Sequence, residues 1–335
     1  MQPAVLGATG VAYPNMALVK YWGKRDESLV LPVTSSVSMT LDIFPTTTRV
    51  TVRPQTETDE VWFNGDPAPP PVRVRVEQFL ELVRGLAGRV EHARVDTVNT
   101  VPTSAGLASS ASGFAALAAA AAHAYGLRPD TRTLSRLARR GSGSACRSVF
   151  GGFVIWHAGT GFGAAGDRTS FAEPLSVGPD AALVIAILDA NAKPVSSRIA
   201  MRRSLVTSPF YLPWASASRG DLVGMCDALT ERDLVRAGQI AEHNALGMHA
   251  MLLASRPAIR YLSPRSLRVL DRVDDLRSTG TPAYATIDAG PNVAVWCASS
   301  DATRVAEALN EIDGLAAVRV ARPGPGVTVT VGEQR

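Results

Sequence analysis

Cysteine and histidine are scarce in this sequence of 335 residues. The three cysteines, Cys146, Cys226 and Cys297, lie far apart and form no CxxC pair, so we expect no disulfide framework and a reducing, cytoplasmic environment. The five histidines show no HxxxH or HExxH spacing, which argues against a zinc site, and we expect no protein-bound metal.

Long apolar runs and blocks of like charge are also missing. The alanine-rich run that ends at Ala122 stays far below the roughly 18 apolar residues of a membrane span. No basic residue precedes the mildly apolar stretch of residues 1–12, so we expect neither a secretory signal nor a membrane partner. The net charge is +4 with scattered basic residues, which disfavours nucleic acid and is compatible with small polyanionic substrates or with simple solubility.

Lysine is rarer still, since only three of the 34 basic residues are lysine. A chain with so strong a preference for arginine can use arginine at any ordinary surface position, whereas lysine is a compact point charge on a flexible stem. Lys20 and Lys24 stand four residues apart, and Lys193 lies near Pro194. We therefore interpret Lys20 and Lys24 as functional, whereas Lys193 is open between a functional and a surface role.

Helical and strand patterns are mixed along the chain. Apolar periodicity and caps predict helices at 72–85, 131–140, 264–278 and 301–312, with helical stretches near 196–206, 218–229 and 231–254. Alternating or β-branched runs predict strands at 36–42, 48–52, 94–99, 151–156, 182–188, 282–287, 293–297, 316–321 and 327–331. Because the elements do not alternate strictly as βαβ units, we expect an α+β fold, with a domain boundary near 172–181.

Small residues dominate the stretch 102–113 (PTSAGLASSASG), which precedes a helix expected from Phe114 to Tyr125. Such residues let a polyphosphate approach the backbone, and the helix N-terminus offers free N–H groups and a positive dipole end. The stretch matches neither GxxxxGK[ST] nor a GxGxxG after a strand. On composition alone, tight helix packing is an equally good explanation of these residues.

Four motifs together resemble one enzyme family. Residues 102–110 resemble the phosphate loop of the superfamily of galactokinase, homoserine kinase, mevalonate kinase and phosphomevalonate kinase. Residues 15–26 (NMALVKYWGKRD), 139–148 (RRGSGSACRS, followed by FGG at 150–152) and 287–292 (IDAGPN) resemble diphosphomevalonate decarboxylase more narrowly. The resemblance implies a two-lobed kinase-superfamily fold, with a ribosomal-protein-domain-like lobe at 1–180, a ferredoxin-like lobe at 181–335, and a cleft between them.

The resemblance also implies the reaction of that family. In it, (R)-5-diphosphomevalonate and ATP, with Mg²⁺ accompanying the ATP, give isopentenyl diphosphate, ADP, phosphate and carbon dioxide through phosphorylation of the 3-hydroxyl. A homodimer and a place in isoprenoid and sterol biosynthesis are implied as well. A phosphomevalonate decarboxylase or a mevalonate 3-kinase remains an alternative, and a nucleotide- or RNA-binding protein of the same fold is the non-enzymatic alternative.

Site roles follow from the same resemblance. The catalytic residues are expected to be Asp288, which faces the 3-hydroxyl, Lys20, which keeps that carboxylate ionised, and Arg147, which grips the substrate carboxylate. The substrate contacts are expected to be Tyr21, Lys24, Ser142, Ser144, Arg147, Ser197 and Arg198. The contacts to the ATP phosphates are expected to be Ser104, Ala105, Gly106, Leu107, Ala108, Ser109, Ser110 and Ser112.

Overall fold

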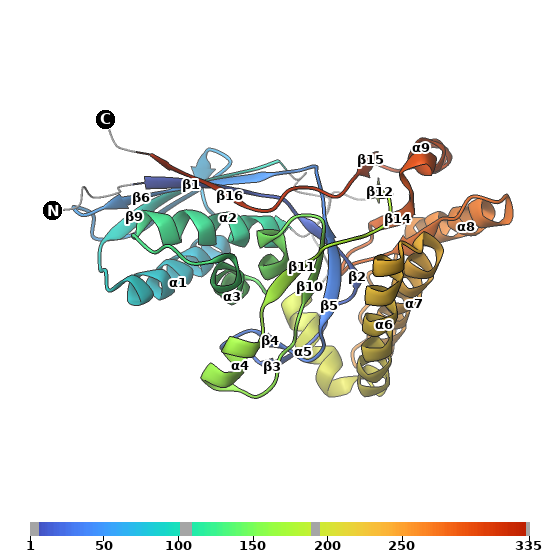
Figure 1. Ribbon diagram of the computed structural model, residues 1–335, viewed down its shortest axis with the longest axis horizontal. Helices are drawn as coiled ribbons and strands as arrows, with labels where there is room; N and C mark the ends of the chain where they lie inside the picture. The colour runs from blue at the N-terminus through green and yellow to red at the C-terminus, as the bar shows by residue number, and fades with distance from the viewer. Residues whose placement is uncertain (1–6, 101–108, 189–194, 333–335) are drawn as a thin grey trace.

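The computed structural model describes residues 7–100, 109–188 and 195–332, and its largest sheet has six strands (Figure 1). These strands follow the order β16-β1-β6-β9-β7-β8, and their pairings are antiparallel apart from that of β7 with β9. Their bounds are Gly7–Ala12 (β1), Thr46–Arg53 (β6), Glu60–Phe63 (β7), Asp66–Pro67 (β8), His92–Asn99 (β9) and Thr328–Gly332 (β16).

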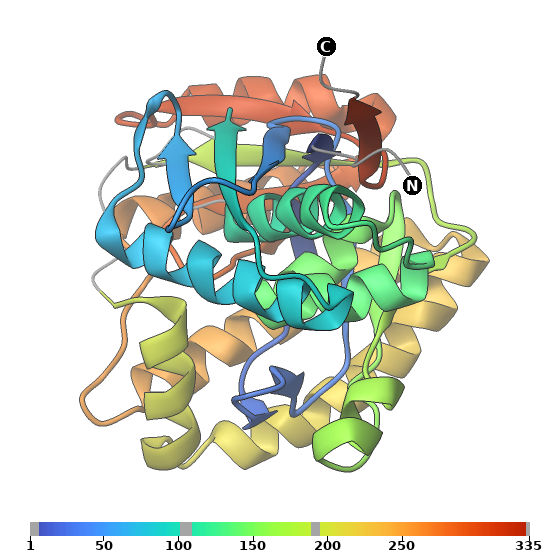
Figure 2. The same cartoon turned by 90° about the vertical axis from the view of Figure 1, so that its left-hand side faces the viewer.

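Three helices, α1 (Pro70–Ala87), α2 (Ser109–Ala124) and α3 (Thr131–Gly141), lie together on one side of this sheet (Figures 1 and 2). The small residues of α2 let it approach β1 closely, because a side chain at Gly10 would meet the Ala116 carbonyl oxygen at only 2.3 Å. Apolar residues of the sheet and of these helices form one continuous core. Burial of that surface is the main force that stabilises this layer.

A second, four-stranded sheet has the order β11-β10-β5-β2. Its bounds are Ala172–Leu175 (β11), Phe153–Trp156 (β10), Ser36–Thr40 (β5) and Asn15–Val19 (β2). The pairing of β2 with β5 shifts in register between Ala17 and Val19, so the chain leaves the ladder just before Lys20. Two short helices stand before and after β10 in the sequence, η1 (Gly143–Val149) and α4 (Gly163–Thr169).

A third sheet, with the order β13-β14-β12-β15, opens the second half of the chain. Its bounds are Tyr284–Thr286 (β13), Val293–Ala298 (β14), Ala181–Ile187 (β12) and Ala317–Ala321 (β15). The helices of this half are α5 (Ser197–Thr207), α6 (Tyr211–Glu231), α7 (Leu234–Leu253), α8 (Pro264–Ser278), η2 (Ser299–Asp301) and α9 (Ala302–Asn310). One core joins β2, β5 and this sheet to α6 and α7, and another lies between the sheet, α8 and α9.

The end of the chain returns from the third sheet to the first. β15 pairs with β12, whereas β16 pairs with β1, and Figure 1 shows β16 beside β1. Between them, Gly324 N donates to Thr40 O at 2.8 Å and Gly152 N donates to Gly324 O at 2.9 Å. The residues after β15 therefore tie the two halves of the protein together.

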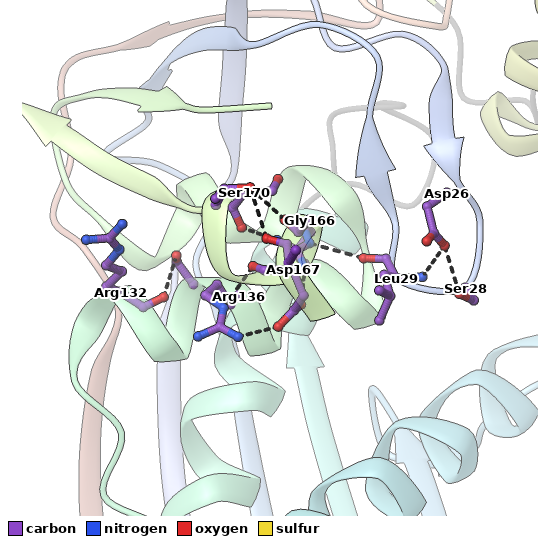
Figure 3. A network of polar contacts seen from close by, with 12 residues as sticks. Asp26, Ser28, Leu29, Arg132, Arg136, Gly166, Asp167 and Ser170 are labelled. Carbon is purple, nitrogen blue, oxygen red and sulfur yellow. Dashed lines mark hydrogen bonds and ion pairs between the residues drawn. The ribbon is translucent and has the colours of Figure 1, made fainter. Parts of the chain in front are cut away.

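A two-stranded hairpin, β3 (Lys24–Asp26) with β4 (Leu31–Pro32), carries one of the rare lysines. Figure 3 shows how its turn is held: Asp26 Oδ1 accepts hydrogen bonds from Ser28 Oγ at 2.8 Å and from Leu29 N at 3.0 Å. The turn is thus rigid through its own polar contacts.

The same hairpin turn is anchored to α3 and α4. Arg139, whose side chain is 0% exposed, donates from Nε to Leu29 O at 3.2 Å and pairs with Asp167. Arg136 also pairs with Asp167 (Figure 3). Paired and hydrogen-bonded in this way, a buried guanidinium can be accommodated, and it links the hairpin to the helix that leads into η1.

The α+β class predicted from the sequence is confirmed, and the helices predicted at 131–140 and 264–278 correspond to α3 and α8. Two helix starts were predicted too late. The helix expected from Phe114 begins at Ser109, and the one expected near 218 begins at Tyr211, since Pro213 is tolerated in a first turn. Within the described ranges, no helix combines the length and apolar character needed to span a bilayer.

Candidate active site

One cleft of about 750 Å³ collects residues from both halves of the chain, a volume within the usual range of ligand pockets. Its ionisable lining is strongly unbalanced in charge, which suits polyanionic ligands. The basic members are Lys20, Lys24, Arg75, Arg140, Arg147, Arg198 and Arg202, and the acidic members are Glu27 and Asp288.

Lys20 and Asp288 form an ion pair inside this cleft, with 2.7 Å between Nζ and Oδ1. The Lys20 side chain is 2% exposed, whereas that of Asp288 is 31% exposed and faces the open cleft. Burial lowers the pKa of Lys20, and the Asp288 carboxylate opposes that shift. The pair therefore combines a buried cation with a carboxylate that a ligand can reach.

The backbone around Ala17 brings these two residues together, although they are 268 positions apart. Its carbonyl oxygen accepts from Lys20 Nζ at 2.8 Å and from Thr286 Oγ1 at 3.0 Å. Thr286 ends β13, and Asp288 follows two residues later in the turn towards β14. A single carbonyl thus aligns the lysine of the first half with the aspartate of the second.

Arg147 lies in η1 with its side chain buried and all its hydrogen bonds directed at neighbours. Nε and Nη2 donate to Asn15 Oδ1 at 3.1 and 3.0 Å, and Nη1 donates to Ser36 Oγ at 2.6 Å. Asn15 is itself held by donation to Ser144 O at 3.0 Å and to Ser148 Oγ at 2.8 Å. The guanidinium is therefore presented to the cleft in a fixed orientation.

Tyr21 also lines the cleft, and its hydroxyl is buried with no hydrogen-bond partner among the described residues. Gly143 makes room for this ring, because a Cβ there would approach the ring and its hydroxyl to 2.8 Å. Burial raises the pKa of Tyr21 above its ordinary value, so the phenol remains a donor. A buried donor without an acceptor is costly, which favours a polar ligand at this point.

Lys24 completes this end of the cleft from the β3–β4 hairpin. Its Nζ lies 2.7 Å from Glu27 Oε2, and both residues line the cleft. The lysine is mostly covered, with a side chain 10% exposed, whereas the glutamate is 48% exposed. The Lys24 ammonium is therefore enclosed, whereas its partner Glu27 is open to solvent.

The predicted serine contacts and Arg198 come from three segments. Ser142 and Ser144 flank Gly143 before and within η1, Ser197 and Arg198 begin α5, and Ser110 lies in the first turn of α2. All of them line the cleft, and Ser110 Oγ lies 3.3 Å from Ser142 Oγ. The N-terminal ends of α2 and α5 add their positive dipole ends.

Two groups of predicted nucleotide contacts stand apart. Ser112 is buried at 0% exposure, with its Oγ 2.7 Å from Thr46 Oγ1 of β6, so it faces the sheet and does not line the cleft. The predictions on Ser104, Ala105, Gly106, Leu107 and Ala108, and on the side chain of Ser109, lie outside the described residues, as does Lys193.

Several cleft residues had no role in the sequence-based prediction. Arg75 of α1 donates from Nη2 to Gly141 O at 3.1 Å, and burial, with a contribution from nearby Arg198, lowers its pKa to about 10. Arg140, Arg202 and Glu27 are the others with a charge. No local pattern marks Arg75 and Arg202 among so many arginines, whereas Arg140 and Asn15 lie within motifs quoted above and were overlooked there.

The buried His249 of α7 lies close enough to Lys20 and Asp288 for their charges to affect it, and this leads to a prediction on stability. Burial, and next the Lys20 ammonium, lower its pKa to about 4, and its Nε2 has no hydrogen-bond partner among the described residues. A histidine in the unfolded chain has a pKa of about 6.5, so between pH 6.5 and pH 4 the unfolded chain binds more protons at this residue than the folded protein does. The stability of the fold therefore decreases as the pH falls through this range.

We expect His249→Gln to weaken this acid dependence. The free energy of unfolding of the native protein should decrease by up to about 1.4 kcal/mol per pH unit more steeply than that of the variant in this window. Chemical denaturation at pH 7, 6 and 5 measures it, with the exposed His243→Gln as control. Equal slopes for native protein and His249→Gln would contradict the assignment.

Comparison with known proteins agrees with this geometry. Residues 12–172 match the family model for the diphosphomevalonate decarboxylase-like N-terminal domain, and residues 183–318 match that for the mevalonate 5-diphosphate decarboxylase C-terminal domain. The diphosphomevalonate decarboxylase of Homo sapiens is 36% identical over 310 residues, which cover 86% of this chain and 76% of the human protein.

Solved structures are similar over nearly the whole length. A complex of MDDEF with MVAPP, AMPPCP and magnesium has a TM-score of 0.92 and 40% identity, covering 98% of this chain and 99% of that one. The mevalonate diphosphate decarboxylase of Staphylococcus aureus has a TM-score of 0.92 and 37% identity, covering 97% and 98%.

Proposed function

Because this chain belongs to the diphosphomevalonate decarboxylase family, we infer that it catalyses the ATP-dependent decarboxylation of (R)-5-diphosphomevalonate. The products are isopentenyl diphosphate, ADP, phosphate and carbon dioxide, and the 3-hydroxyl is phosphorylated on the way. The single observation that carries this function to a site is the Lys20–Asp288 pair in the cationic cleft. Membership of an enzyme family also argues against the non-catalytic RNA-binding alternative.

We propose that Asp288 receives the proton of the substrate's 3-hydroxyl while the oxygen of that hydroxyl attacks the γ-phosphorus of ATP. The bond from that phosphorus to the bridging oxygen of ADP then breaks. Lys20 keeps the carboxylate ionised at 2.7 Å and offsets the charge that develops on the transferred group. Such a transfer depends on positioning and charge neutralisation more than on covalent chemistry by the protein.

We propose that Arg147 controls the second step. The C3–O bond breaks and phosphate leaves, the C1–C2 bond breaks and carbon dioxide leaves, and the electron pair of that bond forms the C2–C3 double bond. The planar guanidinium, held by Asn15 and Ser36, can orient the substrate carboxylate for this alignment. Ser142 and Ser144 are proposed hydroxyl partners of the same carboxylate.

Four residues are proposed to bind the diphosphate: Tyr21, Lys24, Ser197 and Arg198. The orphaned Tyr21 hydroxyl, the enclosed Lys24 ammonium and the first turn of α5 support this assignment. Among the residues that the structure describes, Ser110 at the α2 N-terminus is our candidate for binding the ATP phosphates. We do not assign Ser112 to the nucleotide, because its side chain is buried against β6.

The cleft fits ATP with Mg²⁺ on its own chemistry. Seven basic side chains against two acidic ones favour a nucleotide polyphosphate beside a second polyanion. Among the described residues, no group of three or more His, Cys, Asp or Glu side chains could hold a metal ion, so we propose that Mg²⁺ is carried by the ATP phosphates. When bound there, it neutralises phosphate charge.

Three further proposals concern the whole protein. We propose lobes at 1–180 and 181–335, supported by the gap between β11, which ends at Leu175, and β12, which begins at Ala181. β16 is the exception, because it lies in the second range but pairs with β1 of the first. We propose a cytoplasmic location, supported by the free thiols of Cys146, Cys226 and Cys297. We also propose a homodimer whose product enters isoprenoid, including sterol, biosynthesis, on the strength of the family alone.

Lys24→Gln tests the diphosphate assignment. We expect the KM for diphosphomevalonate to rise about 10-fold or more, because one charge-assisted hydrogen bond is lost, whereas kcat changes little because the contact is the same before and during reaction. Steady-state kinetics with mevalonate 5-phosphate as second substrate measures it. The native enzyme should prefer the diphosphate and the variant should lose much of that preference.

An exposed arginine provides the control, since Arg53→Gln should leave both constants unchanged. An unaltered KM in Lys24→Gln would remove Lys24 from the substrate site. A native preference for the monophosphate would instead favour the phosphomevalonate decarboxylase alternative.

A further inference from the structure

A buried series of hydrogen bonds runs from the backbone of Lys20 through α7 to α6. Asn244 of α7 accepts a hydrogen bond at Oδ1 from the backbone N of Lys20 at 2.8 Å. Its Nδ2 donates to Ser218 Oγ at 3.0 Å and to Asp221 Oδ2 at 2.8 Å, both on α6. Asn244 and Ser218 are each 1% exposed, so this contact is made without competition from bulk water.

The backbone at Lys20 depends on this side chain because no strand holds it. β2 ends at Val19, and its register with β5 has already shifted between Ala17 and Val19. The N–H of Lys20 therefore turns away from the sheet and meets the Asn244 carboxamide. The ammonium at the other end of the same residue is held by Ala17 O and Asp288.

The chemistry on both sides dictates which way the Asn244 amide points. The Lys20 N–H is a donor only, so it requires the amide oxygen, and the Asp221 carboxylate is an acceptor only, so it requires the amide nitrogen. The backbone oxygen of Asn244 is also engaged, by Trp214 Nε1 at 3.2 Å. An amide with both ends fixed in a buried site holds its partner more precisely than packing alone.

We propose that Asn244, oriented by Asp221 and Ser218, is a positioning residue that fixes the Lys20 backbone so that its ammonium meets Asp288. This inference rests on the proposed role of Lys20. Asn244 does not line the cleft, so it acts through the lysine that it contacts. Its loss should therefore slow the chemical step more than it weakens binding.

An exchange of the Asn244 amide and the Asp221 carboxylate tests this assignment directly. Asn244→Asp keeps the shape but replaces the donor towards Asp221 with a second negative charge, so at pH 8 we expect kcat to fall about 10-fold or more with KM within about 3-fold. Asp221→Asn alone should cost less than Asn244→Asp, because an amide oxygen still accepts. The double variant N244D/D221N restores donor and acceptor in exchanged order, and we expect its kcat to return to within about 3-fold of the native value.

Three comparisons keep the test decisive. If circular dichroism shows that Asn244→Asp does not fold, Asn244→Ala replaces it, with the same expected decrease in kcat. The control is His243→Ala, at an exposed neighbouring position on α7, and its kcat and KM should equal the native values. A native kcat in both Asn244 variants, or a loss that Asp221→Asn does not rescue, would overturn the inference. Lys20→Met separates the two proposals: an active Lys20→Met refutes the role of Lys20, whereas an inactive one beside active Asn244 variants refutes only the role of Asn244.

Discussion

Asp288→Asn is expected to lower kcat by at least about 10²-fold while diphosphomevalonate still binds, because an amide cannot take the proton of the 3-hydroxyl. The change also leaves the Lys20 ammonium, 2% exposed, without its carboxylate partner at 2.7 Å. Burial, and next the charge of Arg147, then lower the pKa of Lys20 without opposition, so the positive charge beside the transferring phosphoryl group is weakened as well. ADP release and the Kd for substrate, measured on the same preparation, separate catalysis from binding.

A double variant checks whether the pair acts as a unit. Lys20→Met combined with Asp288→Asn should be little slower than the slower single variant, since losses within one catalytic unit are not additive. Asp313→Asn, at an exposed position on another part of the surface, is the matched control and should retain activity. A fully active Asp288→Asn enzyme would remove this carboxylate from the mechanism.

Arg147→Lys is expected to lower the rate of carbon dioxide release by about 10²-fold, although the charge is kept. The guanidinium directs Nε and Nη2 at Asn15 Oδ1 and Nη1 at Ser36 Oγ, and an ammonium on a flexible stem has no such planar set of donors. The substrate carboxylate would then lose its fixed alignment with the departing phosphate. Initial rates of ADP and carbon dioxide measure this, and the carbon dioxide rate should fall at least as far as the ADP rate.

The control for that variant is Arg319→Lys, an exposed arginine on β15 that should behave as the native protein. Circular dichroism and a thermal melt show whether Arg147→Lys keeps its fold, because the residue is buried. A folded Arg147→Lys enzyme with native carbon dioxide release would exclude the proposed grip on the carboxylate.

Local signals explain what the sequence alone could predict. α3 and α8 have caps at Asp130 and Ser263 and clear apolar spacing, so their positions follow from neighbouring residues. β2 was not recognised because all five of its residues are buried, which removes the alternation of a half-exposed strand. The partnership of β16 with β1 joins opposite ends of the chain, which no local pattern encodes.

The candidate site divides in the same way. Lys20 and Lys24 stood out through the scarcity of lysine, and the motif around Asp288 resembled that of a known family. Asn244 and Arg75 could not be predicted, because their partners Lys20 and Gly141 are distant in the sequence and the contacts exist only after folding. The proposed catalytic residues lie in recognisable motifs, whereas a residue that holds one of them in place, such as Asn244, is revealed by the three-dimensional contacts.

The stoichiometry of ADP and carbon dioxide is the most direct test of the central claim, that one cleft around Lys20, Asp288 and Arg147 couples phosphoryl transfer to decarboxylation. The purified protein is incubated with ATP, Mg²⁺ and (R)-5-diphosphomevalonate, and both products are followed in the same reaction. The account predicts equal amounts of ADP and carbon dioxide at every time point. Production of ADP without carbon dioxide would identify a 3-kinase, and the absence of both would contradict the assigned function.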